Sequence, residues 1–180
     1  MAVELPPTTT ALANQLIVFL TTPPAASSGI PTVAEVNAGL AAQCFIYGNF
    51  NVTPTQNTGE GPRKNCRPNA PTNLGIVTYP ATELQYSYMP QELGAPGADG
   101  NELYEALEPG AVITAVVLDG ISGETESVAA GDVADVYEMK AGVRRKGQTG
   151  DGEFDEKSVT QALVVVGGGP VVEDHPLAAA

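Results

Sequence analysis

The stretch that decides the fold reads Asp132-Val-Ala-Asp-Val-Tyr-Glu-Met-Lys-Ala-Gly-Val-Arg-Arg145, followed by a second extended run, Phe154-Asp-Glu-Lys-Ser-Val-Thr-Gln-Ala-Leu-Val-Val-Val166. Between the runs, residues 146–153 hold three glycines among polar residues, a composition typical of a chain reversal. Both runs are rich in Val, Thr and Tyr and lack the 3-4-7 spacing of a helix. In the second run, one face of a strand holds Val159, Gln161, Leu163 and Val165. The sequence therefore predicts a long β-hairpin over residues 132–166.

This hairpin resembles the end of the major tail tube proteins of long-tailed, non-contractile (siphovirus-type) bacteriophages. The resemblance lies in a strand that reads Val-Ala-Asp-Val-Tyr-Glu138, a glycine-rich turn from Arg145 to Glu156, and a return strand that reads Ser-Val-Thr-Gln-Ala-Leu-Val-Val165. It follows the order of elements over most of the chain and is sharpest from about Asp99 onward.

The resemblance implies a structural virion protein of the phage tail that assembles in the cytoplasm of the host bacterium. It implies two packed antiparallel sheets, a flanking helix, and long loops that bridge subunits in hexameric rings stacked as a tube. The implied partners are further copies of the chain, the tape-measure, tail-terminator and distal tail proteins, and phage DNA, which passes through the lumen during ejection without specific binding. An alternative is another β-rich virion component, such as a head-decoration or tail-completion protein, or a non-enzymatic binding module.

Composition independently favours a mainly β fold in one domain that covers residues 1–180. The chain is 43% hydrophobic, has no Trp, and scatters 20 Gly and 15 Pro along its length, which fits many short elements separated by turns. We expect an antiparallel β-sandwich or a partly closed barrel with one flanking α-helix. Neither Cys44 nor Cys66 lies in a metal-binding motif, so they are free thiols or form one long-range bridge.

The expected elements follow from local patterns. Strands are expected over residues 15–20, 40–50, 82–89 and 111–118, of which the last is apolar on both faces and therefore central. Residues 31–39 predict one or two helical turns, and residues 99–108 predict a helix of nine or ten residues. Residues 1–14 are expected to form an N-terminal arm, 51–73 a long loop, and 170–180 a C-terminal tail.

No catalytic, cofactor or metal site is expected. The single histidine, His175, has no G-x-S-x-G turn to accompany it. Asp151, Glu153 and Asp155 have the spacing of a calcium loop, but Glu156 stands where such a loop needs glycine. The N-terminus lacks the charged leader of a signal peptide, and no apolar run is long enough to cross a membrane.

Charge suggests two kinds of assembly surface. Twenty-one acidic residues against eight basic ones give a net charge of −13, which opposes tight binding of phosphates. We expect part of this acidity to line a channel for DNA, and the candidates are Asp132, Asp135, Glu138, Asp155 and Glu156. Six of the eight basic residues form two clusters, which we expect to contact neighbouring subunits: Arg63, Lys64 and Arg67, and Arg144, Arg145 and Lys146.

Overall fold

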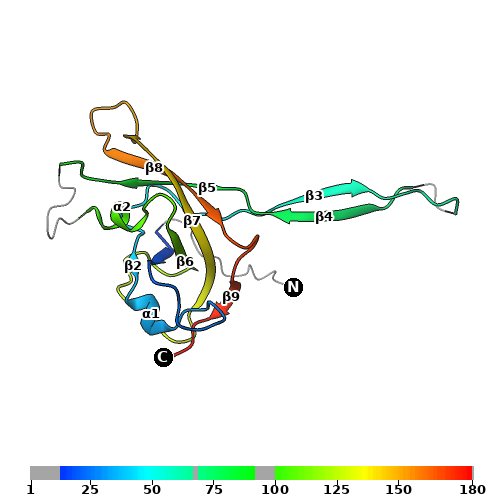
Figure 1. Cartoon of the computed structure of the whole chain (residues 1–180), viewed down its shortest axis with the longest axis horizontal. Coiled ribbons are helices and arrows are strands. Elements are labelled where there is room, and N and C mark those ends of the chain that lie inside the picture. The colour runs from blue at the N-terminus through cyan, green and yellow to red at the C-terminus, as the bar shows by residue number, and fades with distance from the viewer. Residues whose placement is uncertain (1–12, 67–68, 92–99, 180) are drawn as a thin grey trace, which may run out of the picture.

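A computed structural model describes residues 13–66, 69–91 and 100–179. The strands are, in chain order, β1 (Gln15–Leu20), β2 (Leu40–Ala41), β3 (Thr55–Glu60), β4 (Thr72–Thr78), β5 (Thr82–Ser87), β6 (Val112–Asp119), β7 (Val133–Gln148), β8 (Lys157–Val165) and β9 (Val172–Pro176), and the short helices are α1 (Val33–Asn37) and α2 (Glu102–Ala106). Seven strands form one antiparallel sheet in the order β2-β1-β6-β7-β8-β5, with β9 also paired to β7. The sheet curls into a half-barrel (Figure 1).

A short connecting segment closes the open side of this half-barrel. After β2, the amide of Ala42 donates to the carbonyl of Ile17 on β1 at 2.8 Å. The amide of Tyr47 then donates to the carbonyl of Gln85 on β5 at 2.9 Å. Residues 42–47 thus run from one end of the sheet to the other. The expected mainly β fold with a partly closed barrel is confirmed, with two short helices rather than one.

The inner face of the curl holds the larger of two apolar clusters. Strands β1 and β5 lie at opposite ends of the main sheet, yet Phe19 and Tyr86 are fully buried in the same cluster, so this face is concave. The expected alternation in β5 is confirmed, because Leu84, Tyr86 and Tyr88 all point into this cluster. The central position of β6 is also confirmed, since residues 113–118 are buried on both faces.

The outer face is covered at one end only. There Val36 of α1, Val128 and Leu177 pack over the even-numbered side chains of β1 and β6. The helix α1 begins with the expected capping box: Thr32 Oγ1 accepts from the amide of Glu35, and the Glu35 carboxylate accepts from the amide of Thr32. Hydrogen bonds that the Glu35 carboxylate accepts from the amide of Ala25, the amide of Thr32 and the hydroxyl of Thr32 lower the pKa of Glu35.

The long hairpin is confirmed, since β7 and β8 pair over most of their lengths. A bulge interrupts the ladder between Ala141 and Arg144, so Gln161 faces Arg144 rather than Val143. Gly142 lies within the bulge, where a Cβ atom would approach the carbonyl oxygen of Ala162 to 2.9 Å. The bulge therefore depends on glycine at this position.

Four expectations of local structure are wrong. The strand expected over 40–50 ends at Ala41, because the chain leaves β1 there to cross to β5. The helix expected over 99–108 covers only Glu102–Ala106 in the described part of this range, which begins at Gly100. The side chain of Asn101 binds the backbone of Met89 and does not cap the helix. The expected C-terminal tail contains β9. The expected loop over 51–73 contains β3, which pairs with β4.

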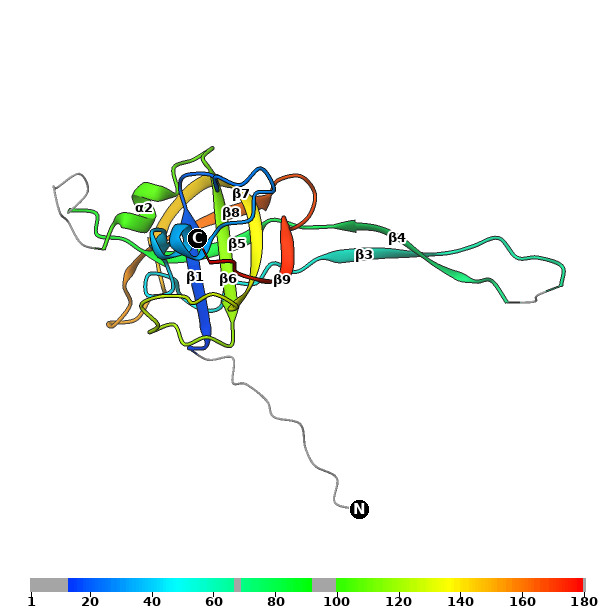
Figure 2. The ribbon, with the colours of Figure 1, turned by 90° about the horizontal axis from the view of Figure 1, so that it is seen from below.

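The hairpin of β3 and β4, which we call the arm, projects from the body of the protein in both views (Figures 1 and 2). It forms a two-stranded sheet of its own. Every residue of β3 and of β4 is exposed. The arm therefore has no hydrophobic core inside this subunit.

Substitution of two glycines of β7 by alanine tests whether the bulge depends on glycine. We expect Gly142→Ala to lower the free energy of unfolding by about 1–3 kcal/mol, because the new methyl group meets a backbone carbonyl that cannot move aside. Gly147→Ala is the matched control, since nothing lies within 4 Å of its added Cβ. Urea denaturation of the unassembled subunit measures both, and equal effects would contradict this account of the bulge.

Candidate assembly surfaces

The arm exposes apolar side chains on β4. Leu74 and Ile76 are 73% and 76% exposed, and Val77 is 42% exposed. A bulge between Leu74 and Val77 shifts the pairing by one residue, so these two side chains share a face and Ile76 lies in the bulge. Sequence reasoning missed this surface, although Thr72-Asn-Leu-Gly-Ile-Val-Thr78 carries a readable alternation of apolar and small or polar residues. The arm is thus an apolar surface that the subunit itself leaves uncovered.

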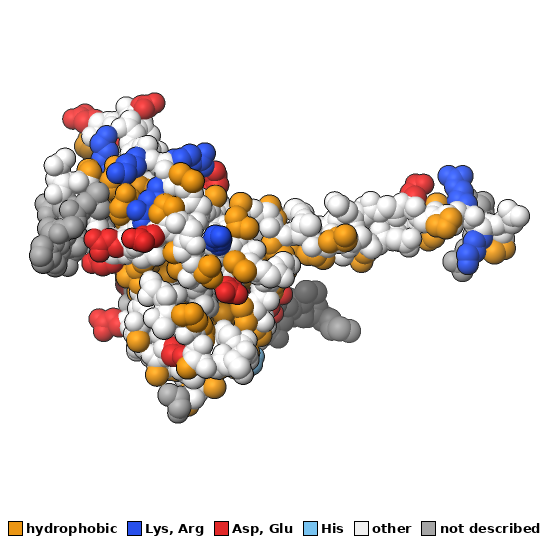
Figure 3. Space-filling view, viewed as in Figure 1, with side chains coloured by type: hydrophobic (Ala, Val, Ile, Leu, Met, Phe, Trp, Pro, Cys, Tyr) orange, Lys and Arg blue, Asp and Glu red, His pale blue; other side chains and the backbone are white. Residues whose placement is uncertain are grey.

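A second uncovered surface lies on the outer face of the main sheet. Val112 of β6, Lys140 of β7 and Val164 of β8 are direct neighbours across the three strands. The two valines are 49% and 46% exposed. The helix α1 and strand β9 cover the other end of this face and leave this row free. In the body, side chains of Lys and Arg gather over the far end of β7 and β8 (Figure 3).

Within that basic group, Arg144 is bound inside its own subunit. Its guanidinium lies 3.9 Å from the centre of the Tyr104 ring. Its Nε donates to the carbonyl of Leu107 at 3.2 Å, and its Nη2 donates to the carbonyl of Tyr104. Both carbonyls belong to the end of α2, whose negative dipole favours a cation. Arg144 therefore fixes α2 to the hairpin.

Gln161 completes this attachment from β8. It is fully buried, and its Nε2 donates to the carbonyls of Leu107 at 3.0 Å and Gly142 at 2.7 Å. Its Oε1 accepts from the hydroxyl of Tyr86 at 2.8 Å. Burial raises the pKa of Tyr86 to about 12, so the hydroxyl keeps its proton at neutral pH. Gln161, the polar residue on the inner face, thus has hydrogen-bond partners for both its amide nitrogen and its carbonyl oxygen.

The other basic candidates have looser contacts. Arg145 forms an ion pair with Glu83 in which both side chains are more than 60% exposed. Lys146 Nζ lies 5.6 Å and 5.7 Å from the rings of Tyr88 and Tyr104. Arg63 and Lys64 are exposed near the tip of the arm, and Arg67 lies outside the described residues. The two basic clusters therefore lie on different parts of the molecule.

The structure does not bring the five lumen candidates to one face. Asp132 accepts from the amide of Ala129 at 2.7 Å, and Asp135 accepts from that of Asp174 at 2.8 Å. Asp155 accepts from Thr149 Oγ1 at 2.8 Å inside the β7–β8 turn, and Glu156 accepts from the hydroxyl of Tyr47. Glu138 is exposed beside Lys140 on the outer face of the sheet. Four of the five thus take part in local hydrogen bonds.

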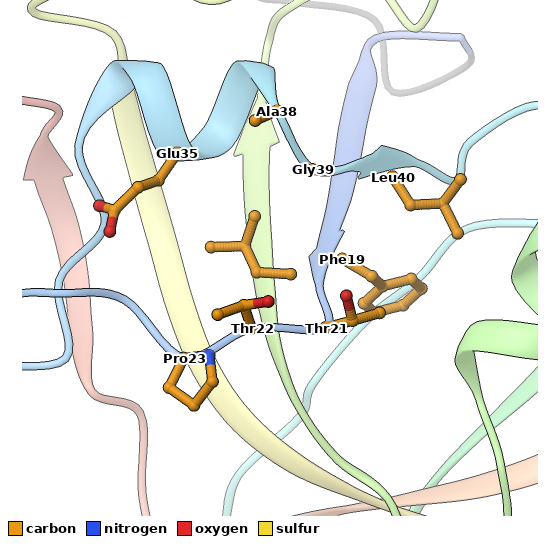
Figure 4. A pocket seen from close by; sticks show the side chains of 9 residues that line it. Phe19, Thr21, Thr22, Pro23, Glu35, Ala38, Gly39 and Leu40 are labelled. Carbon is orange, nitrogen blue, oxygen red and sulfur yellow. The ribbon is translucent and has the colours of Figure 1, made fainter.

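A groove of about 430 Å³ lies between β1 and α1 (Figure 4). Phe19 and Leu40 form one wall, Thr22 and Pro23 the floor, and Ala38 and Glu35 lie on the side of α1 (Figure 4). The Glu35 carboxylate is already used in capping the helix. The groove therefore offers an apolar depression and no free catalytic group among the residues that line it.

The architecture is that of a β-rich structural protein with surfaces for self-association. The chain matches the family described as "Phage tail tube protein" over residues 3–179, and it therefore belongs to this family. The resemblance found in the β7–β8 hairpin is thereby confirmed at the level of the tail tube. No curated protein sequence matches the chain.

Membership defines the role at a coarse level. The protein is a structural component of the phage tail, hence of the virion, and its family is not a family of enzymes. It associates with copies of itself into a tube and contacts other tail proteins. No helix in the described part of the chain is long and apolar enough to cross a membrane.

Two adjacent arginines separate a role in the fold from a role in assembly. We expect Arg144→Ala to lower the free energy of unfolding by about 1–3 kcal/mol, because two backbone carbonyls lose a charged donor. We expect Arg145→Ala to cost less than about 1 kcal/mol, because its ion pair is exposed. Thermal unfolding of the unassembled variants measures both, and a larger loss for Arg145→Ala would be inconsistent with these contacts.

Proposed function

We propose that the protein forms hexameric rings that stack into the tail tube and that the arm joins one subunit to the next. The observation that carries this proposal is the full exposure of β3 and β4. A two-stranded hairpin without a core is only marginally stable in water, so it needs a partner surface to hold its shape. The ring size of six rests on the resemblance to non-contractile phage tails.

Two further features support burial between subunits. The uncovered row of Val112, Lys140 and Val164 gives the main sheet an apolar strip that a neighbour can cover. Leu74 and Ile76 supply exposed apolar side chains on the arm. Repeated contacts between two different surfaces of identical subunits produce closed rings or extended helical assemblies.

We also propose that the tube conducts the phage genome and that its ends contact the tape-measure, tail-terminator and distal tail proteins. The net charge of −13 supports passage without adhesion, because carboxylates repel the phosphates of DNA. Among the five acidic candidates, Glu138 fits a lumen best, since it is exposed on a sheet face and no hydrogen bond of its side chain is described. Asp132, Asp135, Asp155 and Glu156 each accept a hydrogen bond within the subunit.

Substitution of the exposed apolar side chains of the arm tests their role in assembly. We expect the double change Leu74→Ser and Ile76→Ser to abolish tubes in negative-stain images, because it removes the surface that a neighbour buries. Unfolding of the free subunit should shift by less than about 0.5 kcal/mol, since both side chains are exposed. The conservative pair Leu74→Ile and Ile76→Val keeps the surface apolar and should keep the tubes. Normal tubes from the serine variant would contradict the proposal.

A change in the charge of Glu138 tests whether this residue lines the conduit for DNA. We expect Glu138→Lys to assemble into tubes whose phage particles release DNA more slowly, because a cation in the wall attracts phosphate. Glu138→Gln removes the charge without reversing it and should have a smaller effect. Release is followed by the fluorescence of a DNA-binding dye after the particles are triggered. Unchanged release from intact Glu138→Lys particles would remove Glu138 from the lumen.

A further inference from the structure

A groove of about 330 Å³ lies beside the start of β1, between the segment that follows β2 and the loop after β6. Its walls include Ile17, Gln43, Cys44, Gly48, Gly123 and Glu124. The side-chain Nε2 of Gln43 donates to the backbone carbonyl of Gly123 at 2.8 Å, and this hydrogen bond holds the two segments together. The groove thus has an apolar wall and a polar rim made from separate parts of the chain.

The rim of this groove carries a negative charge without a partner. Glu124 is exposed at the groove and forms no ion pair with any described residue. An exposed carboxylate of this kind favours a group that is cationic and rich in N–H donors.

The tip of the arm has this chemistry. Arg63 and Lys64 are exposed there, and neither forms an ion pair with a described residue. Figure 3 shows basic side chains gathered at the far end of the arm. One chain therefore presents a basic tip on the arm and a groove with an exposed carboxylate on its body.

We propose that this groove receives the arm tip of a second copy of the chain, with Arg63 and Lys64 facing Glu124. The proposal rests on the proposed role of the arm in assembly and names the surface that receives it. Because tip and groove are different surfaces, the contact runs head to tail and propagates around a ring or along a tube. The opposite charges steer the encounter and select the orientation.

The two cysteines of the chain report directly on this contact. Cys44 lines the groove, and Cys66 lies near the arm tip; both are free and exposed. The arm holds its own Cys66 away from the body of the same chain (Figures 1 and 2). Docking brings Cys66 of one copy close to Cys44 of the next. A short bismaleimide, which joins two thiols, therefore links neighbouring subunits when the tip occupies the groove.

The experiment uses assembled protein treated with this bismaleimide and analysed on denaturing gels. Wild type should give a ladder of dimers, trimers and larger species, because each subunit offers one thiol of each kind. Cys44→Ala alone and Cys66→Ala alone should give monomers. An equal mixture of the two variants, assembled together, should stop at dimers. This pattern requires a link between Cys44 and Cys66 of different subunits.

Charge reversal provides an independent readout. We expect Glu124→Lys to lower the cross-linked fraction about tenfold, and the pair Arg63→Glu and Lys64→Glu to do the same. Mixing subunits that carry Glu124→Lys with subunits that carry the reversed tip should restore links between the two kinds. Glu126→Lys, in the same loop but outside the groove, is the matched control and should leave cross-linking unchanged.

The outcomes separate this site from the wider proposal. Tubes that form normally but give no Cys44–Cys66 link overturn the groove as the receiving surface and leave the tube intact. A ladder in Cys44→Ala alone means that arm tips meet each other, which also overturns it. A protein that stays monomeric under every condition contradicts the proposed assembly itself.

Discussion

The structure depends on one constraint: a β-hairpin with no core of its own keeps its shape only against another surface. The body solves this problem internally, because its sheet curls until β1 and β5 share one apolar cluster and residues 42–47 close the gap. The arm does not, since every residue of β3 and β4 is exposed. The subunit thus joins a partly closed barrel, which buries its own core, to a hairpin that has no core. Because members of the tail tube family associate with copies of themselves, we propose that a neighbouring subunit supplies the surface that covers the arm.

Much of the fold was predictable from period-two alternation. The sequence indicates the buried faces of β5, β6 and β8, because apolar residues predominate on one side of each strand, with Gln161 as the buried polar exception in β8. The arm was not predictable in this way. Its strands are rich in polar residues and glycine and bury nothing in the subunit, so the hydrophobic pattern that marks a buried strand is weak. The end of β2 at Ala41 likewise depends on the distant edge of β5.

The contacts of the basic and acidic candidate residues were likewise not predictable from the sequence. The sequence shows that Arg144 and Arg145 are adjacent, but only the bulge at Gly142 decides that Arg144 turns inward toward Gln161 and α2. A cluster of carboxylates likewise suggests a wall, whereas hydrogen bonds to nearby amides and hydroxyls commit Asp132, Asp135 and Asp155 to local turns and pairings. Net charge is readable from composition, but the distribution of charge over faces is a property of the fold.

Hydrogen–deuterium exchange of the arm, compared between free subunits and assembled tubes, tests the central claim most directly. In free subunits, the backbone amides of β3 and β4 should exchange rapidly, while those of β6 and β8 stay protected by the barrel. In tubes, the arm amides should become protected, because a neighbouring copy covers them. Protection of β3 and β4 that is equally strong in free subunits, or equally weak in tubes, would contradict the claim that the arm is completed by another subunit.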